Sequence, residues 1–183
     1  ISGNRVSLNY VRYGADVTIE PGELSDFYLI QIPIAGRAEV TNGRHSVLST
    51  PKVATILNPD RETRMRWHSG CEKLLLQVDR SYLHEVAAEM SGLPVGPVRF
   101  RPGLDLEEPA AAGWVRRLRG LFAAADDGIV FAEPGSSHQQ RLEEALLLSL
   151  LESQPSTISP LLAQTETGAS PAILKRAVTM IND

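Results

Sequence analysis

The strongest constraint on the fold of this sequence is a change of pattern near residue 80. Before that point, turn residues such as Pro21-Gly22, Asn42-Gly43 and Asn58-Pro59 separate short runs rich in β-branched and aromatic residues. After that point, apolar residues recur at helical spacing. A set of strands followed by a set of helices predicts an α+β chain, in which the strands form a sandwich or a barrel.

The strands that we expect are short and regularly spaced, with no helix between them that would favour a parallel sheet. They cover residues 6–13, 17–20, 27–34, 38–40, 46–48, 52–57, 64–68 and 73–78. Asn42-Gly43 is the best hairpin signal, because both residues tolerate the positive φ of a type I′ turn.

The second part of the chain predicts helices over residues 81–90, 107–125 and 137–152. Ser81 is the expected cap of the first helix, and Ser136 or Ser137 that of the third. Residues 154–169 are rich in Ser, Thr, Gln and Pro and predict a linker. Ser170-Pro171 then begins a last helix, over residues 170–183. The expected parts are therefore residues 1–80, 81–153, 154–169 and 170–183.

Composition and charge narrow the class of protein. The 183 residues are 43% hydrophobic and 22% charged, which is ordinary for a globular domain. The lone cysteine, Cys71, allows no internal disulfide and favours the cytoplasm. The apolar run at 145–151 is too short to span a membrane. A net charge of −4 predicts weak binding of this chain to DNA by itself.

Catalytic and metal-binding motifs are missing from the sequence, so we expect no catalytic residues, no metal and no cofactor. There is no nucleophile elbow, P-loop or dinucleotide-binding glycine motif. At the position two residues before His68, where a small β-barrel metalloenzyme would carry a second histidine, Arg66 stands, and a guanidinium does not ligate metals. A pairing of His45 with His68 across strands stays open as an alternative.

Residues 61–68 combine three arginines with Trp67 and give the candidate ligand site. Guanidinium groups bind carboxylates and stack on aromatic rings. Residues on the early strands could face the same cavity, so the candidate ligand-binding set is Tyr10, Arg12, Tyr28, Arg66 and Trp67. The alternative is that Trp67 fills the barrel and that the polar tips of the others are solvated.

The leucine-rich stretch at 138–152 is apolar over more than one helix face. It could pack entirely inside its own domain, or it could carry a dimer seam. The candidate dimer-interface residues are Leu142, Leu146, Leu147 and Leu150.

Several stretches together resemble the N-terminal domain of AraC/XylS-type transcription regulators. Residues 27–36 resemble a strand of that family that ends in a glycine turn, and 51–59 resemble its next hairpin segment. Residues 64–67 and 74–80 with Leu83 are similar to the exit from its barrel into its first helix. Residues 171–181 are similar to the first helix of its DNA-binding domain.

The resemblance implies a cupin-like antiparallel β-barrel followed by a helical subdomain. The barrel would hold a small-molecule effector without metal, and the helices would join two subunits as a homodimer. DNA would be bound by a domain that carries helix-turn-helix motifs. Residues 170–183 would be the first helix of that domain, and the motifs would follow beyond residue 183. Two alternatives remain: a cupin-like enzyme such as an isomerase or dioxygenase, and a dimerisation module without an effector.

Overall fold

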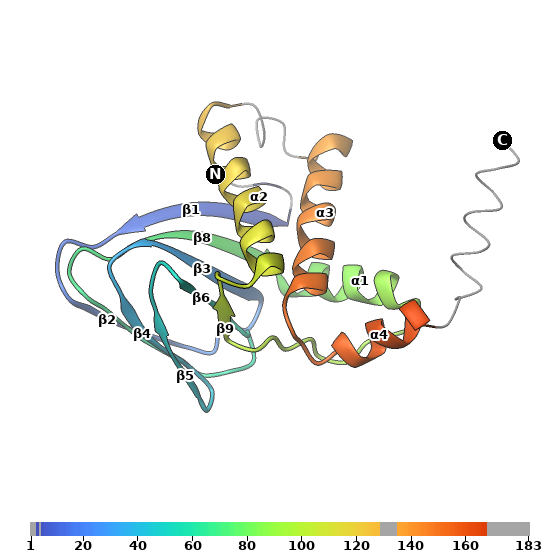
Figure 1. Cartoon of the computed structure of the whole chain (residues 1–183), viewed down its shortest axis with the longest axis horizontal. Coiled ribbons are helices and arrows are strands. Elements are labelled where there is room, and N and C mark those ends of the chain that lie inside the picture. The colour runs from blue at the N-terminus through green and yellow to red at the C-terminus, as the bar shows by residue number, and fades with distance from the viewer. Residues whose placement is uncertain (1–2, 4, 129–134, 168–183) are drawn as a thin grey trace, which may run out of the picture.

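The computed structural model describes residue 3, residues 5–128 and residues 135–167, and these form two β-sheets and a helical layer. Figure 1 shows the helices on one side of the strands, with β9 between the two groups. The five-stranded sheet has the order β1-β8-β3-β6-β9 and the four-stranded sheet the order β2-β7-β4-β5, with every pairing antiparallel. The strands are β1 (Val6–Arg12), β2 (Val17–Gly22), β3 (Phe27–Ala35), β4 (Ala38–Asn42), β5 (His45–Ser49), β6 (Val53–Leu57), β7 (Thr63–Trp67), β8 (Glu72–Asp79) and β9 (Gly103–Asp105).

The predicted α+β class with antiparallel strands is confirmed. The strands lie in two facing sheets of a jelly-roll type rather than in one closed barrel, since β5 and β6 are joined only by the bridge between Thr50 and Val53 in the described part of the chain. The sheet also extends past the expected boundary at residue 80, because β9 pairs with β6.

The central strands of the larger sheet are buried on both faces. On β3, Tyr28, Ile30 and Ile32 belong to the core under the helices, whereas Leu29 and Gln31 face the smaller sheet. Side chains alternate between the two faces of a strand. Double burial therefore explains why residues 27–34 are apolar almost throughout.

The β4–β5 hairpin is present, but its turn lies one residue later than expected. Asn42 pairs with His45, so the two turn residues are Gly43 and Arg44. Gly43 has φ +61° and Arg44 has no positive φ, which fits a type II′ turn rather than the expected type I′. The Asn42 side chain points inward instead, where it is buried and hydrogen-bonded.

In the described residues, the helical layer contains three of the four expected helices and one helix, α4, that was not expected. They are α1 (Arg80–Ser91), α2 (Pro109–Asp126), α3 (Ser137–Ser153) and α4 (Ser159–Thr167). Ser136 caps α3 as expected, but Asp79, not Ser81, caps α1 by accepting a hydrogen bond from the Tyr82 N–H. None of the described helices is long and apolar enough to cross a membrane.

The segment that composition predicts to be a linker is packed against the rest of the fold over residues 154–167. Gln154 is buried and donates to the carbonyls of Arg101 and Gly103. Ser156 forms a β-bridge with Phe100, and α4 follows. Polar composition did not show this, because the partners lie more than 50 residues away in the chain. The predicted helix at 170–183 lies outside the described residues.

Candidate functional site

The five predicted ligand-binding residues lie in different places. On β7, Arg66 is exposed near Asp16, while Trp67 is buried between the sheets. Neighbours on one strand point to opposite faces, so these two side chains cannot line one cavity. Tyr28 lies on the other face of the larger sheet, under the helices, where its hydroxyl contacts His84 and the Val98 carbonyl.

Tyr10 and Arg12 lie in the C-terminal half of β1, which is an edge strand of the larger sheet. Tyr10 is 54% exposed and donates a hydrogen bond to Glu72, which also pairs with Arg12 at 3.2 Å. Tyr10 lines a surface hollow of about 550 Å³ together with Leu8 and Phe122. The structure therefore does not bring the predicted set together in one site.

The space between the sheets is occupied by the chain's own side chains. Lys73 is fully buried, donates to the Gln31 carboxamide at 2.8 Å, and places its ammonium 4.4 Å from the centroid of the Trp67 ring. Tyr13 packs edge-on against the same ring. Burial lowers the pKa of Lys73 to about 8, because the charged ammonium is poorly solvated there.

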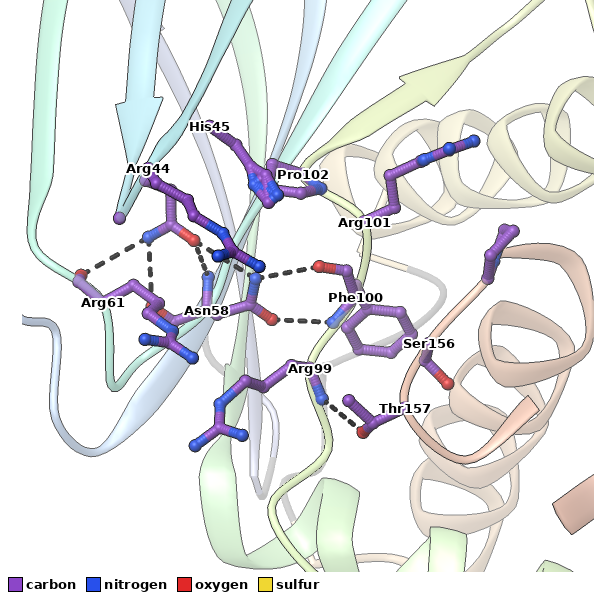
Figure 2. A pocket seen from close by; sticks show the side chains of 13 residues that line it. Arg44, His45, Asn58, Arg61, Arg99, Phe100, Arg101, Pro102, Ser156 and Thr157 are labelled. Atoms are coloured by element: carbon purple, nitrogen blue, oxygen red, sulfur yellow. Dashed lines mark hydrogen bonds between the residues drawn. The ribbon is translucent and has the colours of Figure 1, made fainter. Parts of the chain in front are cut away.

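A cleft opens instead at one end of the sheets, beside the segment that precedes α4. Its volume is about 660 Å³. Figure 2 shows its lining: Arg44 and His45 from the β4–β5 hairpin, Asn58 and Arg61 from the turn after β6, residues 99–102, and residues 155–157. We call this site the arginine cleft, after Arg44, Arg61, Arg99 and Arg101.

Buried amide groups form the floor of the arginine cleft. Asn58 exchanges two hydrogen bonds with the Phe100 backbone, donating at 3.0 Å and accepting at 2.8 Å. It also donates to the Asn42 side-chain oxygen at 3.1 Å. Asn42 and Asn58 are each only 3% exposed. Their network therefore joins the hairpin, the turn after β6 and the segment at residue 100 into one rigid base.

One wall of the arginine cleft is a short pairing of extended backbone between two segments that are far apart in the sequence. Arg101 N–H donates to the Pro155 carbonyl, Thr157 N–H donates to the Arg99 carbonyl, and Arg99 N–H donates to the Thr157 hydroxyl. Residues 155–157 lead directly into α4. A ligand in the cleft would therefore contact both the sheets and the segment that leads toward the C-terminal part of the chain.

The candidate set predicted from the sequence contains none of the arginines of this cleft. Arg61 belongs to the arginine-rich run at 61–68, but the predicted member of that run, Arg66, faces solvent elsewhere. Val98 and Phe100 are buried while Arg99 and Arg101 line the cleft, and this alternation over residues 98–101 is the sequence signal that could have pointed to extended backbone here.

Three of the four predicted dimer residues are buried inside this chain. Leu146, Leu147 and Leu150 are at most 4% exposed and belong to the core between the helices and the larger sheet. Trp114 of α2 donates its indole N–H to the Leu146 carbonyl. Leu142 is only half-buried. A dimer seam on α3 therefore stays a prediction, with Leu142 as its remaining candidate.

The residues that the structure describes contain no group of three histidine, cysteine, aspartate or glutamate side chains arranged to hold a metal ion. His68 lies near Asp16 and Glu39, and His45 lies at the arginine cleft.

Two facing antiparallel sheets with a helical layer define the class of fold, and comparisons with known proteins define the family. The AraC-like transcriptional activator CuxR has this fold with a TM-score of 0.60 and 11% identity, over 83% of this chain and 54% of that one. Apo ToxT K231A from Vibrio cholerae strain SCE256 has a TM-score of 0.53 and 9% identity, over 82% of this chain and 56% of that one.

The sequence itself shows the family. Residues 2–152 match the family described as AraC-binding-like domain, and the chain belongs to that family. The probable thc operon regulatory protein of Rhodococcus erythropolis is 30% identical over 154 residues, which cover 82% of this chain and 42% of that protein. The predicted relationship to AraC-type regulators is confirmed, and the chain spans about half the length of the relatives it matches.

Proposed function

We propose that this chain is the effector-binding and dimerisation part of a bacterial transcription regulator that responds to a small molecule. Its relatives are described as regulators and activators of transcription, which supports a non-enzymatic role. The observation that carries the proposal is the arginine cleft, a cavity of about 660 Å³ shared by the sheets and by residues 155–157. Cavities of this size hold metabolite-sized ligands.

The proposed effector site differs from the set chosen from sequence. The interior between the sheets is filled by Trp67, Lys73 and Gln31, each at most 2% exposed. The arginine cleft is open, and its walls come both from the strand region, through the β4–β5 hairpin and the turn after β6, and from residues 99–102 and 155–157. We therefore place the effector in the cleft.

Regulation in this proposal depends on the pairing of residues 99–101 with 155–157. An effector that binds the paired arrangement more tightly than an unpaired one stabilises the paired state, and the position of α4 responds. DNA would be bound by a part of the whole protein outside this chain, because the net charge of −4 on this chain repels the DNA backbone overall. The whole protein would act in the cytoplasm as a homodimer.

The test is a thermal-shift screen of this chain against sugars, aromatic acids, fatty acids and phosphorylated metabolites. An effector at 100 times its dissociation constant stabilises a fold by about 2.7 kcal/mol, which shifts the melting temperature measurably. With the hit bound, hydrogen exchange is expected to slow at residues 97–103 and 155–157 but not along β1, the internal control. No hit in the whole panel would favour a dimerisation module without an effector.

A hit could instead slow hydrogen exchange along β1 and between the sheets and leave residues 155–157 unchanged. The chain would then still be proposed as part of a regulator, but its effector would bind in the interior between the sheets. Stoichiometric iron, manganese or zinc in the purified protein would support the alternative of a cupin-like enzyme.

A further inference from the structure

The ligand class can be inferred from the charges around the arginine cleft, an inference that rests on the proposed function. Arg44, Arg61, Arg99 and Arg101 line the cleft together with His45. None of the described residues that line it is acidic. A concave site with one sign of charge concentrates ligands of the opposite sign.

One carboxylate neutralises part of this charge. Asp60 pairs with Arg99 through contacts of 2.7 and 2.8 Å, and its other oxygen lies 4.0 Å from Arg61. The hydrogen bond from Arg99 lowers the pKa of Asp60, so this carboxylate stays ionised. In the described part of the chain, Arg44 and Arg101 have no ion pair within 4 Å. Positive charge therefore remains in excess.

The backbone positions of these arginines are fixed before any ligand arrives. Arg99 and Arg101 are held by their pairing with Thr157 and Pro155. Arg44 is the second residue of the two-residue turn, and the stem of Arg61 packs over Gly43, where an added Cβ would lie 3.2 Å from Arg61 Cδ. In Figure 2 the side chains of Arg61 and Arg99 extend to the same side of the view, while that of Arg101 extends away from them. A fixed framework lowers the entropy cost of binding.

We propose that the arginine cleft binds a small ligand that carries a phosphate or diphosphate group, anchored by Arg44 and Arg61. Guanidinium groups pair bidentately with phosphate oxygens. A phosphate group carries more charge and more acceptor oxygens than a single carboxylate. It can therefore pair at the same time with Arg44, which has no ion pair in the described part of the chain, and with Arg61, whose contact with Asp60 is 4.0 Å long. Arg99, already paired with Asp60, holds the wall, and Arg101 marks the outer rim.

The experiment is calorimetric titration of this chain with inorganic pyrophosphate at fixed ionic strength. The double variant Arg44→Gln/Arg61→Gln is compared with Arg37→Gln/Arg116→Gln, which removes the same charge from two exposed arginines outside the cleft. Each anchoring guanidinium is expected to contribute about tenfold, so the cleft variant should bind about 100-fold more weakly. The matched variant should bind like the unaltered chain, and both should melt normally.

Three results would overturn the proposal. The first is no pyrophosphate binding by the unaltered chain, and the second is equal weakening in both double variants, which would mean diffuse attraction. The third is that Arg44 and Arg61 matter only for binding a duplex DNA of random sequence, which would make this face a DNA-contacting surface. If the screen finds an uncharged compound whose binding is the same in Arg44→Gln/Arg61→Gln, this inference would be wrong while the proposed function would stand.

Discussion

At the scale of single residues, the space between the sheets holds a lysine where an aliphatic side chain would be usual. Lys73 is fully buried, and its ammonium contacts the Gln31 carboxamide and the Trp67 ring. In the described part of the chain it has no carboxylate partner within 4 Å. A buried cation without an anionic partner costs stability, and the pH dependence of unfolding reports that cost.

The first prediction concerns Lys73→Met. The folded-state pKa of about 8 lies below the ordinary value of 10.5, so the unfolded chain binds more protons between these values. The free energy of unfolding of the unaltered chain should therefore rise as pH goes from about 8 to about 10.5, by up to about 3 kcal/mol relative to Lys73→Met. Denaturant titrations at several pH values measure the difference.

The control for Lys73→Met is Lys52→Met, which removes an exposed lysine paired with Glu107. That variant should keep the rise with pH. An identical pH dependence in the unaltered chain and in Lys73→Met would mean that the buried ammonium is better stabilised than its contacts indicate.

The second prediction concerns Asn58, which holds the floor of the arginine cleft. Asn58→Ala leaves the buried N–H and carbonyl of Phe100 without their partners, and it removes one of the two donors to the Asn42 oxygen, which keeps the Asn58 backbone N–H. Unsatisfied buried polar groups are costly, so we expect a loss of about 2–4 kcal/mol in unfolding free energy. Asn9→Ala, at an exposed position on β1, is the control and should change little. A loss below about 0.5 kcal/mol for Asn58→Ala would mean that water replaces these contacts.

At the scale of elements, the start of α1 offers two residues as its cap, Ser81, which the sequence predicts, and Asp79, which the structure shows. Asp79 accepts from the Tyr82 N–H, while the Ser81 hydroxyl donates to Asp79. The third prediction is that Asp79→Ala destabilises the fold by about 1–2 kcal/mol, since it removes the cap, and that Ser81→Ala costs clearly less. Thermal and denaturant unfolding of the two variants measure this. The reverse order would restore Ser81 as the cap.

The segment before α4 shows how an element depends on distant partners. Residues 154–169 have the composition of a linker, but Gln154 satisfies the carbonyls of Arg101 and Gly103, and Ile158 and Leu162 join the main core. These partners are neighbours only in the folded chain, where the sheet and α3 bring them together. A window of local sequence holds no information about them.

At the scale of the whole molecule, different leucines of α3 are expected to serve the core of the fold and the proposed dimer interface. Leu147 lies in the core, whereas Leu142 is half-buried. The fourth prediction is that Leu142→Glu converts the proposed homodimer into monomers with an unchanged circular dichroism spectrum. A charge at the centre of an apolar seam is not tolerated. Light scattering coupled to size exclusion measures the mass.

Leu147→Ala is the companion variant, because it should lower stability by about 2–5 kcal/mol through a core cavity while the folded fraction remains dimeric. A dimer that survives Leu142→Glu would place the interface on another surface, and a monomeric unaltered chain would contradict dimerisation through this part of the protein.

The sequence by itself determined the antiparallel α+β class, the positions of the strands before residue 80, three helices and the relationship to AraC-type regulators. These follow from patterns that act over a few residues: alternation in strands, helical spacing, and turn and cap residues. It could also have separated Arg66 from Trp67, because adjacent strand residues face opposite sides.

Only the tertiary structure decided where a ligand has room. Which face of β3 holds Tyr28 depends on the helices that cover it, and whether the interior is open depends on how Trp67 and Lys73 fill it. The arginine cleft exists because residues near 44, 60, 100 and 156 meet at one end of the sheets. Its network of hydrogen bonds joins groups up to 58 positions apart, and pairing over such separations is fixed by the packing of the whole chain.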